Sequence, residues 1–147
     1  MLIRFATAAD IPAMMALEHA SVTAAHWPQH QYETAFGDSA RRIALALEED
    51  AKLQAFLIAR SVVDEWELEN IAVAGSARRR GLGSRLLGEF LDRIRAAGGK
   101  AVFLEVRESN HAARALYAKW AFHEYGRRLK YYRQPEEDAV TYRLDLP

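Results

Sequence analysis

Residues 78–84 read Arg78-Arg79-Arg80-Gly81-Leu82-Gly83-Ser84 and join two segments with different hydrophobic periods. The run before them, residues 68–73, is strand-like, and the run after them repeats leucine, phenylalanine and isoleucine at helical spacing. An apolar strand follows that helix, which makes a strand–helix–strand unit with parallel strands and a right-handed crossover. We therefore expect an α/β fold with a mixed sheet organised around this unit.

The turn itself has the chemistry of a phosphate-binding site. A helix N-terminus leaves backbone N–H groups without partners and carries partial positive charge. The two glycines let the backbone approach a ligand closely, and the arginines add charge. The pattern is not a Walker loop, which needs Gly-Lys-Ser/Thr, nor a dinucleotide fingerprint, because Leu86 replaces the third glycine. The residues alone leave open a solvated basic turn that only caps a helix.

Composition restricts the class of protein. The chain has 147 residues, half of them apolar, which suits one domain over residues 1–147. It has 20 basic and 20 acidic residues, a balance that argues against nucleic-acid or anionic-membrane binding. The absence of cysteine excludes disulfides, thiolate metal ligands and a cysteine nucleophile. No apolar run has membrane-spanning length and the N-terminus does not resemble a signal peptide, so we expect a cytoplasmic protein.

Hydrophobic periodicity predicts alternating strands and helices. We expect strands at residues 2–5, 42–47, 53–59, 65–73, 101–106, 122–130 and 140–146. We expect helices at residues 11–17, 83–97 and 112–120, while residues 24–36 are irregular or a second helix interrupted by Pro28. Hairpins at both ends of the chain predict a mostly antiparallel central sheet around the parallel unit, with flanking helices.

Motifs around the turn carry a family resemblance. They are Asn70-Ile71-Ala72-Val73, Leu104-Glu105-Val106-Arg107, Ser109-Asn110, and Ala115-Leu116-Tyr117 with Phe122. In this order and spacing the chain resembles the GCN5-related N-acetyltransferases (GNAT) over nearly its whole length. Within that superfamily it is most similar to bacterial ribosomal-protein-alanine N-acetyltransferases, a similarity supported by residues 104–110 and by Tyr131-Tyr132 followed by residues 136–139.

The resemblance implies acetyl-coenzyme A as cosubstrate. Its pyrophosphate would lie on Arg78, Arg79, Arg80, Gly81, Leu82, Gly83 and Ser84. Ile71, Ala72 and Val73 would run beside the pantetheine arm, and an N–H near Val73 would polarise the thioester carbonyl. Asn110 would contact the cosubstrate from the start of the next helix. No metal is implied, because Pro28 separates His26 from His30 and no third ligand is evident.

The resemblance also implies a base and an acid, since an ammonium must lose a proton and a thiolate is best released protonated. Glu105 is the candidate base, because burial within an apolar strand would make its carboxylate more basic. Strand alternation alone also fits an outward-facing residue. Tyr117 is the candidate acid, since a phenol can donate to a thiolate. Its spacing also fits a core tyrosine packed with Leu116 and Trp120. Without cysteine, direct attack in a ternary complex is expected.

The acceptor implied by the subfamily is a protein N-terminus, the N-terminal alanine of a small-subunit ribosomal protein. An α-amine has a pKa of about 8 against about 10.4 for lysine, so one carboxylate suffices to deprotonate it. Trp27, Tyr131 and Tyr132 would frame this acceptor, or serve only in surface and strand packing. A small-molecule amine, a lysine side chain and a non-catalytic acyl-coenzyme A sensor remain alternatives, and the oligomeric state is not indicated.

The turn before Phe122 departs from the family pattern. Ala121-Phe122 stands where the resembled proteins usually have Gly-Phe. Alanine does not replace glycine freely where φ is positive. We therefore expect the turn after the helix at residues 112–120 to differ slightly from that of the family.

Overall fold

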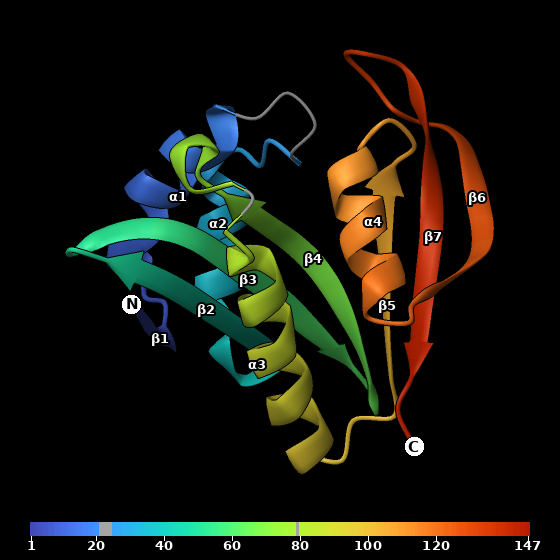
Figure 1. Ribbon diagram of the computed structural model, residues 1–147, viewed down its shortest axis with the longest axis horizontal. Helices are drawn as coiled ribbons and strands as arrows, with labels where there is room; N and C mark the ends of the chain where they lie inside the picture. The colour runs from blue at the N-terminus through green and yellow to red at the C-terminus, as the bar shows by residue number, and fades with distance from the viewer. Residues whose placement is uncertain (21–24, 79) are drawn as a thin grey trace.

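The computed structural model describes residues 1–20, 25–78 and 80–147. Within these residues, seven strands form one sheet in the order β1-β2-β3-β4-β5-β7-β6. The strands are β1 (Leu2–Phe5), β2 (Arg42–Glu49), β3 (Lys52–Val62), β4 (Glu65–Val73), β5 (Ala101–Arg107), β6 (His123–Tyr132) and β7 (Glu137–Asp145). β4 and β5 pair in parallel, whereas all other neighbours are antiparallel. This confirms the expected mixed, mostly antiparallel sheet with one parallel unit (Figure 1).

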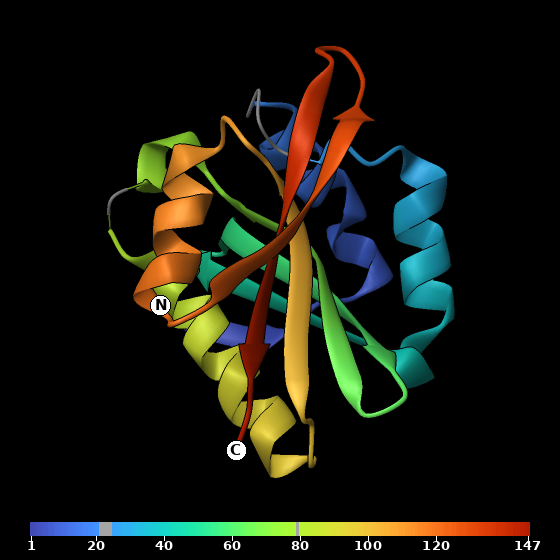
Figure 2. The same cartoon turned by 90° about the vertical axis from the view of Figure 1, so that its right-hand side faces the viewer.

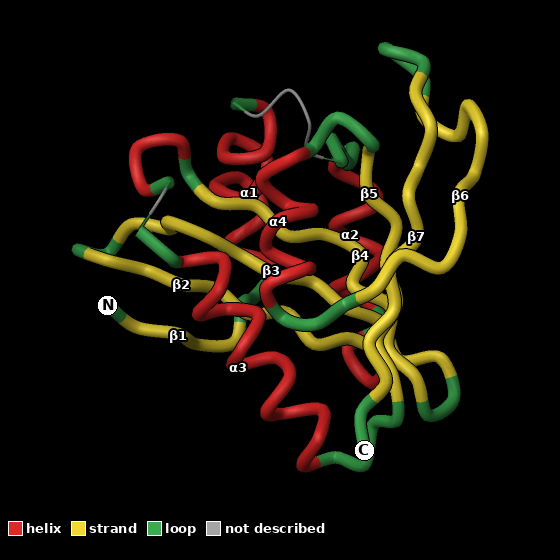
Figure 3. The backbone as a smooth tube through the Cα atoms, turned by 45° about the vertical axis from the view of Figure 1, so that its right-hand side comes forward, coloured by secondary structure: helices red, strands yellow, loops and turns green. Residues whose placement is uncertain are grey.

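Helices cover both faces of the sheet. In the described part of the chain they are α1 (Ile11–His19), α2 (Gln29–Gly37), α3 (Leu82–Ala96) and α4 (His111–Lys119). Figure 2 shows α1 and α2 on one face and α3 and α4 on the other. In Figure 3, β1 lies at one edge of the sheet and β6 at the other. None of the described helices is long and apolar enough to cross a membrane.

The strand β3 carries apolar side chains on both faces of the sheet, so helices must pack on both faces. Its side chains alternate between the faces, as in any strand. Leu57 belongs to the core formed with α3, whereas Phe56 and Ile58 belong to the core formed with α1 and α2, and all three are fully buried. A continuous apolar run of this kind is stable only between two helical layers.

Helix α3 is held by one apolar face. Its buried residues recur at helical spacing: Leu82, Leu86, Leu87, Phe90, Leu91 and Ile94. Burial of a leucine or phenylalanine side chain contributes about 1.5–3 kcal/mol, so this face fixes the helix firmly to the sheet. Gly98, with a φ of +83°, follows the end of the helix, as expected for glycine at this position. The N-terminus of α3 is thereby fixed near the carboxyl end of β4, where the chain leaves the sheet.

The expected elements are present, and the differences concern their ends. Pro28 precedes α2 with extended backbone (φ −69°, ψ 160°) and does not interrupt it. Proline has no N–H to donate, so it is tolerated where a helix begins. β7 begins earlier than expected, at Glu137, because this residue pairs with Tyr132 in the last hairpin. The hydrophobic pattern of residues 137–139 alone does not reveal this pairing with β6.

β4 and β5 separate soon after they begin. Only Glu65–Glu67 of β4 pair with residues 101–103 of β5. Beyond that point β4 continues along β3 and β5 continues along β7 (Figure 1). Leu68 and Asn70 pair with adjacent residues of β3, which leaves Glu69 as the extra residue of a β-bulge. A bulge bends its strand, and here it lies at the point where β4 turns away from β5.

The turn after α4 keeps the backbone conformation that favours glycine. Ala121 has a φ of +69°. The N–H of Ala121 donates to the carbonyl of Ala118 (3.0 Å), and that of Phe122 donates to Tyr117 (3.0 Å). These are the two hydrogen bonds of a Schellman motif, with Ala121 at its left-handed position. A non-glycine residue in this region carries a conformational penalty of about 1 kcal/mol.

We predict that Ala121→Gly stabilises the protein, because glycine adopts this φ without a penalty. The free energy of unfolding should rise by about 1 kcal/mol, or roughly 3 °C in Tm. Ala118→Gly, within the exposed face of the same helix, is the control and should lower it by a similar amount. Urea denaturation of both variants measures the difference; a loss of stability in Ala121→Gly would contradict the interpretation.

Candidate active site

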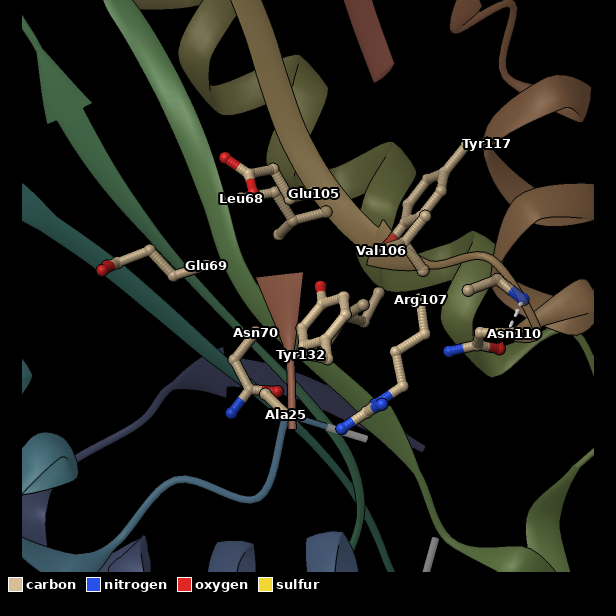
Figure 4. A pocket seen from close by; sticks show the side chains of 12 residues that line it. Ala25, Leu68, Glu69, Asn70, Glu105, Val106, Arg107, Asn110, Tyr117 and Tyr132 are labelled. Carbon is tan, nitrogen blue, oxygen red and sulfur yellow. Dashed lines mark hydrogen bonds between the residues drawn. The ribbon is translucent and has the colours of Figure 1, made fainter. Parts of the chain in front are cut away.

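A pocket lies where β4 and β5 have separated (Figure 4). β4 contributes Leu68, Glu69, Asn70 and Ile71, and β5 contributes Glu105, Val106 and Arg107. The remaining lining residues are Ala25 from the segment before α2, Asn110, Ala113 and Tyr117 around α4, and Tyr132 from β6. Four of the residues singled out in the sequence for chemistry or cosubstrate contact therefore share one pocket: Ile71, Glu105, Asn110 and Tyr117.

Glu105 is the carboxylate of this pocket whose pKa is shifted by its surroundings. Its side chain is 18% exposed, and Oε1 lies 3.1 Å from Nε of Arg128 on β6. Oε2 is buried and has no hydrogen-bond partner among the described residues. Burial raises the pKa of Glu105, the charge of Glu67 raises it further, and Arg128 opposes both. The carboxylate is therefore more basic than an ordinary glutamate, and one of its oxygens has no hydrogen-bond partner among the described residues.

Tyr117 combines core packing with access to the pocket. Its ring lies 5.5 Å from that of Phe122 and 5.8 Å from that of Tyr142, between ring centroids. Burial is the main cause that raises the pKa of the phenol. Both sequence interpretations therefore apply to it, because it packs in the core and also lines the pocket. A phenol with a raised pKa keeps its proton at neutral pH and can donate it.

Arg107 explains how Tyr132 reaches the pocket. The Arg107 guanidinium donates to the carbonyls of Pro135 (3.0 Å) and Arg133 (3.4 Å), in the turn between β6 and β7. It also lies over the ring of Tyr132, 4.4 Å from the centroid. Burial and the charge of Glu105 raise the pKa of Tyr132 to about 12. Arg107 thus fastens the hairpin end against β5.

The N-terminus of α3 has the geometry of an anion site. Gly81 takes the left-handed conformation (φ +76°), which confirms the need for glycine in the turn, and no side chain of the described residues caps the helix. Leu82, Gly83 and Ser84 form its first turn, whose N–H groups have no partner within the helix. The Ser84 hydroxyl accepts a hydrogen bond from Nε1 of Trp120 (3.0 Å), so this hydroxyl is engaged in packing α4 against α3.

The arginines of the turn differ in surroundings. Arg78 directly follows a short 3-10 turn, Gly75–Ala77. Arg80 donates twice to the carboxylate of Glu49, at 2.9 and 2.8 Å. Arg79 lies outside the described residues.

The other residues predicted to contact the cosubstrate lie at the start of α4 and along β4. Asn110 caps α4, since its Oδ1 accepts from the N–H of Ala113 (3.2 Å). Along β4, Ile71 lines the pocket, Val73 packs against the core on the α3 side, and Ala72 is buried on the opposite face with α1 and α2. The expected strand edge beside a pantetheine arm is thus the part of β4 that β5 leaves unpaired.

Of the three residues predicted to frame an acceptor, one lines the pocket and two do not. Tyr132 lines the pocket. Tyr131 is half exposed on β6, with Arg128 5.4 Å from its ring centroid. Trp27 lies away from the pocket, because its side chain is buried against Tyr32, 5.2 Å between ring centroids.

Sequence reasoning missed Asn70 as a pocket side chain and Glu18 behind it. Nδ2 of Asn70 donates to Oε2 of Glu18 (3.0 Å), and Glu18 is fully buried. A signal was present, since Glu18 follows Ile11 and Met14 on the apolar face of a helix. A carboxylate at such a position indicates a buried polar network.

The comparisons with known proteins identify the family. The family model described as "Acetyltransferase (GNAT) family" matches residues 11–122. The chain belongs to the GNAT family of acetyltransferases. A relative from Salmonella typhimurium, ribosomal protein bS18-alanine N-acetyltransferase, is 39% identical over 140 residues, which cover 93% of this chain and 92% of the relative. The N-alpha-acetyltransferase RimI of Mycobacterium tuberculosis is 46% identical over 81 residues, 55% of this chain and 49% of the relative.

A solved structure supports the same assignment. The crystal structure of the ribosomal-protein-S18-alanine N-acetyltransferase from Escherichia coli superposes with a TM-score of 0.88 at 34% identity. The match covers 98% of this chain and 92% of that chain. The protein is thus an acyltransferase with the fold of its family. GNAT acetyltransferases use acetyl-coenzyme A. Among the described residues, no group of three or more His, Cys, Asp or Glu side chains is placed to hold a metal ion.

We predict that Arg128 sets the pH at which Glu105 becomes active. The charge of Arg128 favours the ionised carboxylate, so Arg128→Gln should raise the pKa of Glu105 further. Because a base must be ionised to accept a proton, the acid limb of kcat/KM for acetyl transfer should move to higher pH. Arg127→Gln is the matched control, since Arg127 pairs with Glu108 and Asp138. Identical profiles for wild type and Arg128→Gln would contradict the role.

Proposed function

We propose that the chain acetylates the N-terminal α-amine of a protein, the N-terminal alanine of a small-subunit ribosomal protein of the bS18 type, with acetyl-coenzyme A as donor. The names of the relatives supply the acceptor class. The observation that carries the proposal is Glu105, a largely buried carboxylate that lines the pocket between β4 and β5, has a raised pKa and has one oxygen without a hydrogen-bond partner among the described residues. The partner would then be a ribosomal protein, and the reaction would take place in the cytoplasm.

The residues present fit a coenzyme A thioester. The first turn of α3 offers backbone N–H groups beside Arg78 and Arg80, which suits a pyrophosphate. Release of Arg80 from Glu49 would let it turn to the phosphates, because this ion pair is exposed. Between α3 and the pocket, Ile71 to Val73 offer a strand edge to the amides of the pantetheine arm. When bound, acetyl-coenzyme A supplies an acetyl group already activated as a thioester.

Glu105 and Tyr117 take the two proton-transfer roles. Glu105 accepts a proton from the acceptor ammonium at its carboxylate, directly or through one water, and so produces the neutral amine that attacks. A backbone N–H near Val73 donates to the carbonyl oxygen and stabilises the negative charge that develops there. Tyr117 donates its phenolic proton to the leaving thiolate. Tyr117 acts in the protonated form that burial favours, whereas Glu105 acts as the ionised carboxylate, which burial makes more basic.

An N-terminal amine suits a single carboxylate base. With a pKa of about 8, roughly one α-amine in ten is neutral at pH 7, against fewer than about one lysine in a thousand. The chain has no cysteine, so an acyl-cysteine step is impossible and the amine attacks the thioester directly in a ternary complex. The pocket walls from β4, β5 and β6 then hold the acceptor while α3 holds the far end of the donor.

A peptide panel tests the acceptor. With acetyl-coenzyme A, thiol release should be fastest with peptides that begin Ala-Arg, slower with Met or Ser, and negligible with an acetyl-capped peptide that contains lysine. Release with only the capped peptide would replace the N-terminal acceptor by a lysine side chain, and release with only small amines would indicate a small-molecule enzyme. Tight coenzyme A binding without turnover of any amine would indicate a sensor.

We predict that Glu105→Gln lowers kcat/KM for the Ala-Arg peptide by about 10²-fold or more and removes the acid limb of the pH profile. The amide keeps the shape of the side chain but accepts no proton. Binding of coenzyme A, measured by calorimetry, should change little. Unchanged activity across pH would remove Glu105 from the role of base.

We predict that Tyr117→Phe lowers kcat by about 10²-fold while KM for acetyl-coenzyme A changes little, because only the proton donor is lost. Tyr142→Phe is the matched control. The Tyr142 hydroxyl accepts from Nε of Arg114 (3.0 Å) and its ring packs against that of Tyr117, so its loss should affect stability and not kcat. Equal effects of the two variants on kcat would assign Tyr117 to packing alone.

A further inference from the structure

Glu18 is a buried carboxylate that the proposed mechanism does not use. It lies at the end of α1 with no exposed surface, and it takes part in none of the ion pairs found in the described ranges. Instead Oε1 accepts from the N–H of Trp27 (3.1 Å) and the hydroxyl of Tyr32, and Oε2 accepts from Nδ2 of Asn70 (3.0 Å). Burial of a carboxylate is costly even with such partners, so an apolar residue would serve packing better.

This hydrogen-bond network fixes the orientation of the Asn70 side-chain amide. A carboxylate only accepts hydrogen bonds, so Asn70 must present its NH₂ group to Glu18. The same nitrogen lies 3.5 Å from the hydroxyl of Tyr32. The amide therefore has one orientation, with Oδ1 turned away from Glu18. In Figure 4 this oxygen points toward the side of Tyr132 and Ala25, which line the same pocket.

Oδ1 of Asn70 is thus an acceptor held at the pocket wall. None of the hydrogen bonds formed within the described residues uses this atom. Asn70 lies on β4 and Glu105 on β5, the two strands that separate around the pocket. A ligand amine between them would meet a neutral acceptor on one wall and a basic carboxylate on the other.

We propose that Oδ1 of Asn70 binds an N–H of the acceptor's first residue, and that Glu18 is the positioning residue that keeps this oxygen facing the pocket. The proposal rests on the proposed function, since it assigns the ligand of the same site. The fixed amide orientation distinguishes it from simple core packing. A site built to accept a hydrogen bond loses affinity when it presents a donor instead, because donor and N–H then repel.

Glu18→Gln reverses the orientation without a change of shape. The glutamine oxygen keeps the hydrogen bonds from Trp27 and Tyr32, and its NH₂ group faces Asn70. Asn70 then rotates to offer Oδ1 to that group and turns Nδ2 into the pocket. KM for the Ala-Arg peptide should rise at least about tenfold, the effect of one hydrogen bond, with kcat, KM for acetyl-coenzyme A and Tm nearly unchanged.

The double variant Glu18→Gln/Asn70→Asp should restore the acceptor. The aspartate at position 70 accepts from the glutamine with one oxygen and presents the other to the pocket, so KM should return to within about threefold of the wild-type value. Tyr32→Phe is the control. It removes one donor to Glu18 and the longer 3.5 Å contact to Nδ2 of Asn70, but it leaves the hydrogen bond between Glu18 and Asn70, so it should lower Tm without raising the peptide KM.

Calorimetry with coenzyme A and the Ala-Arg peptide supplies a readout without turnover, and peptide affinity should follow the KM values. Unchanged peptide KM and affinity in a folded Glu18→Gln, or no recovery in the double variant, would overturn the inference. If Glu18→Gln does not fold, Asn70→Ala decides: it should raise the peptide KM about tenfold, and an unchanged KM would overturn the inference. A wild-type protein that acetylates no N-terminal peptide refutes the proposed function itself, which is a separate result.

Discussion

The site depends on one constraint in the sheet, which is that β4 and β5 pair only at their first residues. After Glu67 each strand follows a different partner, β4 along β3 and β5 along β7. The bulge at Glu69 bends β4 at that point, and the hairpin β6–β7 is fastened to β5 through Arg107. Because the two strands cannot satisfy each other's backbone groups there, the opening offers hydrogen-bond donors and acceptors to a ligand.

A fully buried carboxylate, Glu18, and a partly buried one, Glu105, lie near this opening in different environments. Glu18 has a donor for each oxygen and fixes the position of Asn70. Glu105 has one ion-paired oxygen and one without a partner, and burial raises its pKa. Glu18, whose two oxygens both accept hydrogen bonds, suits a positioning role. Glu105, which has an oxygen without a partner, suits proton transfer. The difference lies in the number of donors around each carboxylate and not in the residue type.

Local patterns in the sequence were sufficient for most elements. The apolar face of α3, the left-handed Gly81 and the alternation of β5 are properties of a few neighbouring residues, so periodicity and turn chemistry predict them. The separation of β4 from β5 and the depth at which Glu105 lies depend on pairing between distant strands, which periodicity does not encode. Glu18 could have been found, because it breaks an apolar helix face, but its partner Asn70 lies 52 positions away in the chain.

The central claim is that the opening between β4 and β5 holds both substrates, with the amine beside Glu105. A crystal structure with a bisubstrate ligand tests it most directly, with coenzyme A joined through an acetyl link to the N-terminal alanine of a peptide. The account predicts pyrophosphate at the first turn of α3, the pantetheine arm along Ile71 to Val73, and the alanine nitrogen within hydrogen-bond reach of Glu105 or of a water bound to it. A ligand bound outside this opening, or an alanine nitrogen remote from Glu105, would contradict the account.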